Sequence, residues 1–241
     1  MTDEFLAFVR ASKRGRLKVF LGMAAGVGKT VAMLREGKRL LADGVDVAIG
    51  VVLSHGRAET EREIDGLPRV PMRVLEYRGV PLEEMDLEAV LARRPDVALV
   101  DELAHTNVPG STNDKRWKDV ERLRDEGISV LTCVNIQHLE SLHDLILRET
   151  GVDVRERVPD RIVQQADDVV VIDVPPAELR ERLRAGKIYP SYKVEQALGG
   201  FFREENLGAL RQIALREVAN AMEARVEAIE AFQRDGADLF C

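Results

Sequence analysis

Cysteine is scarce in this sequence, which has only Cys133 and Cys241 among its 241 residues. Two cysteines cannot form a disulfide framework, and such low usage is typical of a protein from the reducing cytoplasm. The cysteines and the four histidines also lack the C-x2-C or H-x3-H spacing of a zinc site. We therefore expect no zinc site.

Long apolar runs and an excess of basic residues are absent as well. The longest apolar stretch, residues 19–27, is interrupted by Gly22 and Gly26. It is far shorter than the roughly 18–20 residues that cross a membrane, and the chain does not open with a basic segment and an apolar signal core. Acidic residues outnumber basic ones by 42 to 35, for a net charge of −7, whereas nucleic-acid binding favours a clustered basic face. We expect a cytoplasmic chain without a membrane segment or a nucleic-acid partner.

A glycine-rich segment is the most informative feature that the sequence does contain. It follows the apolar run of residues 17–21 and reads Gly22-Met23-Ala24-Ala25-Gly26-Val27-Gly28-Lys29-Thr30. Glycines allow a tight turn in which backbone N–H groups and the start of the next helix point at phosphate oxygens. Lys29 is expected to reach the β and γ phosphates, and the Thr30 hydroxyl to ligate Mg²⁺. The predicted nucleotide-binding residues of this segment are Gly22, Ala25, Gly26, Val27, Gly28, Lys29, Thr30 and Val31.

The spacing of this segment departs by one residue from the usual phosphate-binding loop (P-loop). The pattern G-x4-G-K-[ST] requires glycine at position 23, where the chain has Met23, and Gly22 comes one residue too early. The alternative is a glycine-rich turn between a strand and a helix that ends in a solvated lysine. The intact sequence from Gly26 to Thr30, placed directly after a strand, favours the P-loop.

A P-loop needs a nearby carboxylate, and two apolar runs end in one. The run at 97–100 ends in Asp101-Glu102, and the run at 169–172 ends in Asp173. Buried parallel strands read as continuous apolar runs, and ligands bind at their carboxyl ends. We expect Asp101 to hold Mg²⁺ and Glu102 to activate water if hydrolysis occurs. Asp173 has no second acid beside it and precedes two prolines, so it is interpreted as part of a strand-end turn.

Other polar residues follow predicted strands or lie in nearby loops. Arg57 is interpreted either as a phosphate ligand or as a solvated arginine, with neither favoured. Asn135 and Gln137 are alternative γ-phosphate sensors. His105 is interpreted as a residue that orders its loop rather than as a base. Arg57 and Arg116 are the candidates for the positively charged finger that speeds phosphoryl transfer, although neither lies in a motif that fixes it there.

Alternating strands and helices predict an α/β fold. Apolar runs predict strands at 17–21, 46–52, 72–76, 97–101, 128–134 and 169–173. The segments between them predict helices at 28–42, 57–65, 82–93, 114–126, 138–149 and 176–185, with Pro81 marking the start of the third. This order is typical of a P-loop NTPase-like three-layer fold with a mostly parallel sheet. We expect a lead-in over 1–15, the nucleotide-binding domain over 16–188 and a helical segment over 189–241.

The C-terminal segment has the apolar pattern of a long helix. Its stripe consists of Leu207, Leu210, Ala214, Val218, Ala221, Ile229 and Phe232, and Arg225 interrupts it. We favour a helix that packs this face back on the sheet. The alternative is a connector whose stripe docks another module or a second copy of the chain.

Longer motifs are distributed over residues 13–225. They lie at 26–30, 51–57, 101–111, 115–117, 132–142, 158–160, 166–170, 175–176, 186–189 and 201–203. Together they resemble the N-terminal domain of the KdpD family, sensor histidine kinases that respond to potassium and osmotic stress. Members of this family share the unusual P-loop spacing and continue into a universal-stress-type module, membrane helices that anchor them in the inner membrane, and a kinase core. This chain ends before those parts, so we expect either a piece of a longer protein or a short free-standing member.

The resemblance implies a cytoplasmic regulatory domain that binds ATP and Mg²⁺, with slow or no hydrolysis. Its implied partners are potassium-sensing kinase modules or a separate two-component protein, and a second copy of the chain is a further candidate. Two alternatives remain: an active P-loop ATPase, and an interaction module with a vestigial P-loop. The intact pairs Lys29-Thr30 and Asp101-Glu102 argue against the second. Because the motifs of a histidine-kinase core are absent from this sequence, kinase activity is assigned to the family's other modules.

Overall fold

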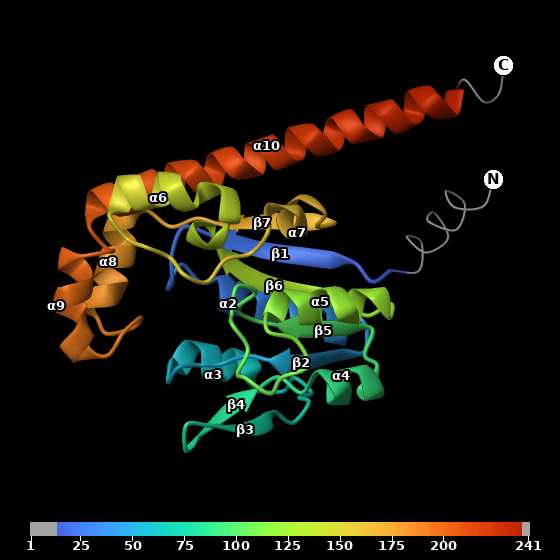
Figure 1. The fold of residues 1–241 in the computed structure, drawn as a ribbon, viewed down its shortest axis with the longest axis horizontal. Helices are drawn as coiled ribbons and strands as arrows, with labels where there is room; N and C mark the ends of the chain where they lie inside the picture. The colour runs from blue at the N-terminus through green and yellow to red at the C-terminus, as the bar shows by residue number, and fades with distance from the viewer. Residues whose placement is uncertain (1–13, 238–241) are drawn as a thin grey trace.

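The computed structural model describes the backbone of residues 14–237 and the side chains of residues 14–220. Its main sheet has five strands in the order β2-β5-β6-β1-β7, and neighbouring strands pair in parallel (Figure 1). The strands are β1 (Leu17–Gly22), β2 (Val47–Val51), β5 (Val97–Val100), β6 (Ser129–Asn135) and β7 (Asp168–Ile172). The α/β fold predicted from the sequence is confirmed.

Strand β6 lies between β1, which leads into the glycine-rich loop, and β5, which leads into Asp101. The register places Gly22 opposite Asn135, and Val100 opposite Thr132. Because the carboxyl ends of parallel strands lie at one edge of a sheet, the residues that follow β1, β5 and β6 are brought together there.

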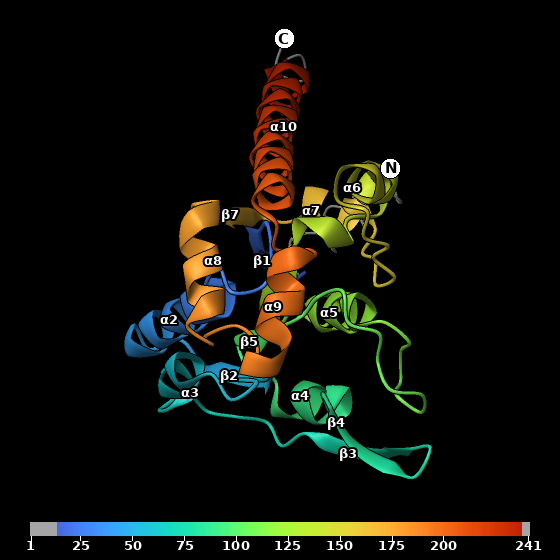
Figure 2. The same ribbon diagram turned by 90° about the vertical axis from the view of Figure 1, so that its left-hand side faces the viewer.

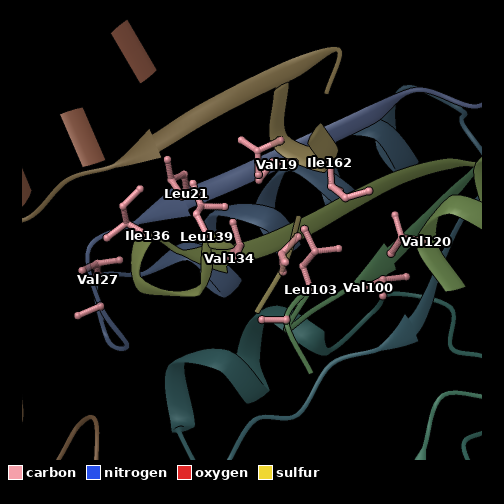
Figure 3. Close-up of a cluster of buried hydrophobic side chains, with 14 of the residues drawn as sticks. Val19, Leu21, Val27, Val100, Leu103, Val120, Val134, Ile136, Leu139 and Ile162 are labelled. Atoms are coloured by element: carbon pink, nitrogen blue, oxygen red, sulfur yellow. The ribbon is translucent and has the colours of Figure 1, made fainter. Parts of the chain in front are cut away.

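Helices cover both faces of the sheet, which explains why its strands are apolar on both sides. Helices α2 (Lys29–Ala42) and α3 (Ala58–Ile64) lie on one face, and α5 (Arg116–Asp125) lies on the other (Figure 2). Phe20 of β1 packs in the core on the α2 side. Its neighbours Val19 and Leu21 point into the opposite core, which Val134, Ile136, Leu139 and Ile162 also line (Figure 3).

The remaining helical segments lie mainly in the C-terminal half of the chain. They are η1 (Ile136–His138), η2 (Glu140–Leu142), α6 (His143–Thr150), α7 (Asp160–Gln164), α8 (Pro176–Arg184), α9 (Ser191–Gly199) and α10 (Glu204–Ala237). The single helix predicted at 138–149 is therefore two short 3-10 turns followed by α6. Its first part deviates because the backbone of His138 and Glu140 hydrogen-bonds to Val158 instead of continuing an α-helix.

Residues 72–93 differ most from the prediction. β3 (Arg73–Tyr77) pairs with β4 (Val80–Glu84) in an antiparallel hairpin that is separate from the main sheet. The helix predicted at 82–93 is wrong in its first part, because α4 begins only at Leu87 and ends at Arg93. Asp86 starts it by accepting a hydrogen bond from the N–H of Ala89 at 3.0 Å. Pro81 is tolerated in β4 because both strands of a two-stranded hairpin are edge strands, where proline's missing N–H need not break a ladder hydrogen bond.

The first part of α10 packs on the domain, as the sequence predicts. Leu207, Leu210 and Ala214 are buried, and Val218 packs against the same core. The C-terminal part of the helix extends past the sheet (Figure 1). The rest of the predicted stripe lies outside the described side chains: Ala221, Arg225, Ile229 and Phe232. None of the helices in the described residues is long and apolar enough to cross a membrane.

Candidate functional site

The loop between β1 and α2 turns on two glycines with positive φ angles, 88° at Gly26 and 105° at Gly28. Residues with a side chain rarely adopt such backbone angles, so both positions need glycine. Gly28 is also the residue from which α2 starts, so the N-terminus of α2 opens into the loop. A loop of this kind that leads into a helix N-terminus is a typical anion-binding arrangement.

Met23, which breaks the usual P-loop spacing, is 2% exposed and belongs to the core beneath the loop. Next to it the chain passes close to itself, since a Cβ atom at Gly22 would lie 2.7 Å from Cγ2 of Val27. The chain therefore accommodates the extra residue by burying Met23, and the stretch from Gly26 to Thr30 keeps its place at the start of α2.

Lys29 lies at the centre of the site. Its Nζ donates hydrogen bonds to the carbonyl oxygen of Ala24, at 2.9 Å, and to Oδ1 of Asn135. Removal from water lowers the pKa of Lys29 to about 8, although the nearby charge of Asp101 raises it. The side chain is thus mostly charged at neutral pH, and its ammonium group is held where the loop and the end of β6 meet.

Thr30 and Asp101 place two oxygen atoms side by side. Oγ1 of Thr30 donates to Oδ2 of Asp101 at 2.8 Å, and Oδ1 of Asp101 accepts the N–H of Glu102 at 2.9 Å. Mg²⁺ binds oxygen ligands and usually takes one or two carboxylates together with water and substrate phosphates. The donor set therefore fits Mg²⁺ with a phosphate ligand. No group of three or more His, Cys, Asp or Glu residues in the described part of the chain is placed to hold a metal alone.

Glu102 has a left-handed backbone, with φ of 57°, a conformation that costs about 1–3 kcal/mol for a residue with a side chain. Its Oε1 is 3.1 Å from Nε2 of His55, and its Oε2 is 3.7 Å from Nη1 of Arg116. The hydrogen bond with His55 lowers the pKa of Glu102 and raises that of His55. Glu102 is thus held by His55 and Arg116 and is not a free base.

These side chains line a cleft of about 940 Å³. The predicted site residues on its wall are Ala25, Gly26, Gly28, Lys29, Thr30, Val31, Arg57, Asp101, Glu102 and Asn135. Three predicted residues are not part of the wall: Gly22, Val27 and Gln137. Gln137 lies in η1, and its Oε1 is buried without a hydrogen-bond partner among the described residues. Of the two predicted sensors, Asn135 is therefore the one that contacts Lys29.

Comparison with known sequences assigns the chain to a family. Residues 13–222 match KdpD, described as the osmosensitive K⁺ channel His kinase sensor domain. The chain belongs to this family. It is 56% identical over 211 residues to the putative sensor protein KdpD of Synechocystis sp.. It is 50% identical over 226 residues to the sensor protein KdpD of Escherichia coli, and 51% identical over 209 residues to that of Mycobacterium tuberculosis.

The chain spans only part of these KdpD proteins. The alignments cover 88%, 94% and 87% of this chain, but 57%, 25% and 24% of the three relatives in the same order. The similarity therefore supports the assignment of this domain, whereas the activity of a longer protein is a separate question.

The loop between α8 and α9 forms part of the cleft wall, although the sequence suggested no role for it. Residues 186–190 all line the cleft, together with Arg182 of α8. Nη1 of Arg182 donates to the carbonyl oxygen of Gly26 at 3.2 Å, and Nη2 of Arg57 donates to that of Ile188 at 3.4 Å. The only available signal was the motif at 186–189, which carries no recognisable chemistry of its own.

Three further predicted residues have structural partners. Arg116, a candidate charged finger, is 1% exposed and donates from Nη2 to Oε1 of Glu84 at 2.5 Å. It is therefore not free to reach over a phosphate. Asp173 pairs with Arg211 of α10, with oxygen-to-nitrogen distances of 2.7 and 2.5 Å, and does not line the cleft. His105 bonds through Nε2 to Oε2 of Glu84 at 3.0 Å, which agrees with its interpretation as a residue that orders its loop.

Proposed function

We propose that this KdpD-family domain binds Mg-ATP in its P-loop cleft and that nucleotide occupancy, rather than fast hydrolysis, is its regulatory signal. One observation carries the proposal: two polar contacts converge where β1, β5 and β6 end. Lys29 of the loop meets Asn135 after β6, and Thr30 meets Asp101 after β5. A cation, an amide and a hydroxyl–carboxylate pair around a glycine-rich loop are the groups that a triphosphate and its Mg²⁺ require.

Each residue has a defined role in this proposal. The backbone N–H groups around Gly26 and Gly28 and the ammonium of Lys29 bind phosphate oxygens. Thr30 and Asp101 hold Mg²⁺, which when bound neutralises phosphate charge. Arg57, which also lines the cleft, adds positive charge near the ligand.

The regulatory part of the proposal is supported by the family and by the state of the water-activating candidate. The relatives are called sensor proteins, and this domain covers only part of their length. We propose that it reports nucleotide binding to a histidine-kinase module or a separate two-component partner in potassium signalling, on the cytoplasmic side. Glu102 is held by His55, and Arg116 by Glu84, so neither is free to speed hydrolysis.

A matched pair of variants tests the metal ligand. Asp101→Asn is expected to weaken Mg²⁺-dependent ATP binding by about tenfold or more, because a hydrogen bond or ligand contact to a charged group contributes about 1.5–3 kcal/mol. Asp173→Asn removes a similar strand-end carboxylate that pairs with Arg211 outside the cleft, and is expected to leave Mg²⁺ dependence unchanged. Calorimetric titration with and without Mg²⁺ measures both. A larger loss of Mg²⁺-dependent binding in Asp173→Asn than in Asp101→Asn would place the metal site at the end of β7 and contradict the proposal.

Turnover is expected to be slow. Loss of a charged finger can cost about 10³–10⁵ in the rate of phosphoryl transfer, and Arg116 is committed to Glu84. We expect a single-turnover hydrolysis rate below about 1 s⁻¹, the lower end for dedicated enzymes. Rapid-quench measurement with radiolabelled ATP gives this rate. A faster rate in the isolated domain would favour the alternative of an active ATPase.

A further inference from the structure

We infer that the base of the nucleotide stacks against the ring of Tyr189, which makes the loop at 186–190 the base-binding wall of the cleft. This inference rests on the proposed function and deepens it, because it names the part of the cleft that distinguishes a nucleotide from bare phosphate. The ligand class that it specifies is a nucleoside triphosphate.

The cleft has a charged end and an aromatic wall. Lys29, Thr30 and Asp101 gather where β1 and β5 end. Ile188, Tyr189 and Pro190 of the α8–α9 loop supply another part of the wall. Among the described residues that line the cleft, Tyr189 is the only Phe, Tyr or Trp. Ligand sites bury the apolar part of a ligand against such side chains, and a base presents a π-face that stacks on an aromatic ring.

This wall directly adjoins the phosphate-binding loop. A Cβ atom added to Gly26 would lie only 2.3 Å from Cδ1 of Ile188. Arg182, at the end of α8, donates to the carbonyl oxygen of Gly26 at 3.2 Å. A ligand whose phosphates occupy the P-loop therefore has the α8–α9 loop beside it, and its base can reach Tyr189 while the phosphates remain in place.

The ring of Tyr189 is held in position by a second aromatic ring, that of Phe202. It packs edge-to-face on Phe202, with ring centroids 5.7 Å apart and an interplanar angle of 82°. Phe202 is 1% exposed and lies in the turn between α9 and α10, so it is a fixed support for the ring. An aromatic ring that is already immobilised loses little conformational entropy when a ligand stacks on it, which favours binding.

Arg57 completes the subsite on the side facing the loop. Its Nη2 donates to the carbonyl oxygen of Ile188 at 3.4 Å. Burial raises the pKa of the Tyr189 hydroxyl while the charge of Arg57 lowers it, which indicates that the two side chains are close enough to interact. Nε of Arg57 is buried and has no hydrogen-bond partner in the described part of the chain. An unpaired buried donor of this kind is a ready partner for a polar atom of the ligand.

The test compares a ligand that has a base with one that does not. Binding of Mg-ATP and of Mg-tripolyphosphate is measured by calorimetry for the wild type, Tyr189→Ala, Tyr189→Phe and Tyr192→Ala. Tyr192 is the matched control because it lies on α9, outside the cleft wall, and is 78% exposed. We expect Tyr189→Ala to weaken ATP binding about 5- to 150-fold, the effect of losing one base–aromatic stack. Tripolyphosphate binding should not change, and neither Tyr189→Phe nor Tyr192→Ala should alter ATP binding.

The outcomes separate this inference from the proposed function. Equal ATP affinity in the wild type and Tyr189→Ala overturns the stacking inference, as does an equal loss of ATP and tripolyphosphate binding in that variant. A wild type that binds tripolyphosphate as tightly as ATP also overturns it, but leaves phosphate binding by the P-loop intact. A wild type that binds neither ligand overturns the proposed function as well.

Discussion

Replacement of Arg116 by methionine is expected to lower the free energy of unfolding by about 3–5 kcal/mol. Arg116 and Glu84 are each 1% exposed, and the substitution leaves the buried carboxylate of Glu84 without its cation. Nη1 of Arg116 also donates to the backbone carbonyl of Asp101 at 3.2 Å, so the loss extends to the candidate metal ligand. Chemical denaturation measures the change, and the Tm should fall by about 6–20 °C for a domain of this size.

Arg122→Met is the matched control for this variant. Arg122 lies on the same helix, α5, and forms an exposed pair with Glu126 at 2.8 Å. Exposed ion pairs contribute about 0–1 kcal/mol, so the control should change stability little. Equal losses in Arg116→Met and Arg122→Met would show that the buried pair does not carry the stability assigned to it.

The same pair gives wild-type stability a defined pH dependence. Burial raises the pKa of Glu84, but the hydrogen bond with His105 and the charge of Arg116 outweigh it and lower this pKa to about 2. A carboxyl group with a depressed folded-state pKa stabilises the fold above its unfolded pKa of about 4.3 and loses this contribution as the pH falls towards 2. Between these values Arg116→Met should therefore lose stability less steeply than the wild type.

The glycine-rich turn and the acidic pair at the sheet edge could be predicted because each is a local pattern. Gly26 to Thr30 form one contiguous turn after β1, and Asp101-Glu102 directly follow the buried run of β5. Parallel strands then bring such ends together at one edge, without any knowledge of particular contacts. The closeness of Lys29 to Asn135 is less predictable, because it depends on β6 lying next to β1 in the sheet.

The hairpin of β3 and β4 was missed because its last residue is held by a distant partner. Proline followed by acidic residues is a reasonable helix start, and on that basis residues 82–86 were predicted to be helical. In the structure Glu84 pairs with Arg116, 32 positions later in the chain, and Asp86 caps α4 instead. The pairing of Glu84 is not visible in the local sequence, since a buried ion pair is a property of the folded chain.

The base-binding wall was missed for the same reason. Arg182 and Gly26, whose contact joins α8 to the glycine-rich loop, are 156 positions apart. Residues 186–190 follow the helix predicted at 176–185, at the boundary between the predicted nucleotide-binding domain and the helical segment. Ile188 and Tyr189 line the cleft only because the loop between α8 and α9 packs against Gly26, in the loop before α2.

Lys29→Ala is expected to abolish the stabilisation of the domain by Mg-ATP. At about 100 times its Kd, a ligand that binds only the folded state adds roughly 2.7 kcal/mol to stability, or about 5–10 °C in Tm. Lys29 supplies the ammonium at the centre of the site, between the loop and Asn135. Thermal melts with and without Mg-ATP measure the shift, and a wild type that does not respond to saturating ATP or GTP would refute nucleotide binding itself.

Lys38→Ala separates loss of the phosphate contact from general loss of positive charge on α2. Lys38 lies on the same helix but pairs with Glu63 at 3.2 Å on the surface, so its variant should keep the full ATP-dependent shift. The pH gives a second, independent check, because burial lowers the pKa of Lys29 to about 8. Binding of an anion requires the charged lysine. The increase in the Tm of the wild type caused by Mg-ATP should therefore become smaller as the pH rises above about 8. An ATP-dependent shift that persists in Lys29→Ala, with the same pH dependence as the wild type, would assign the binding to other residues.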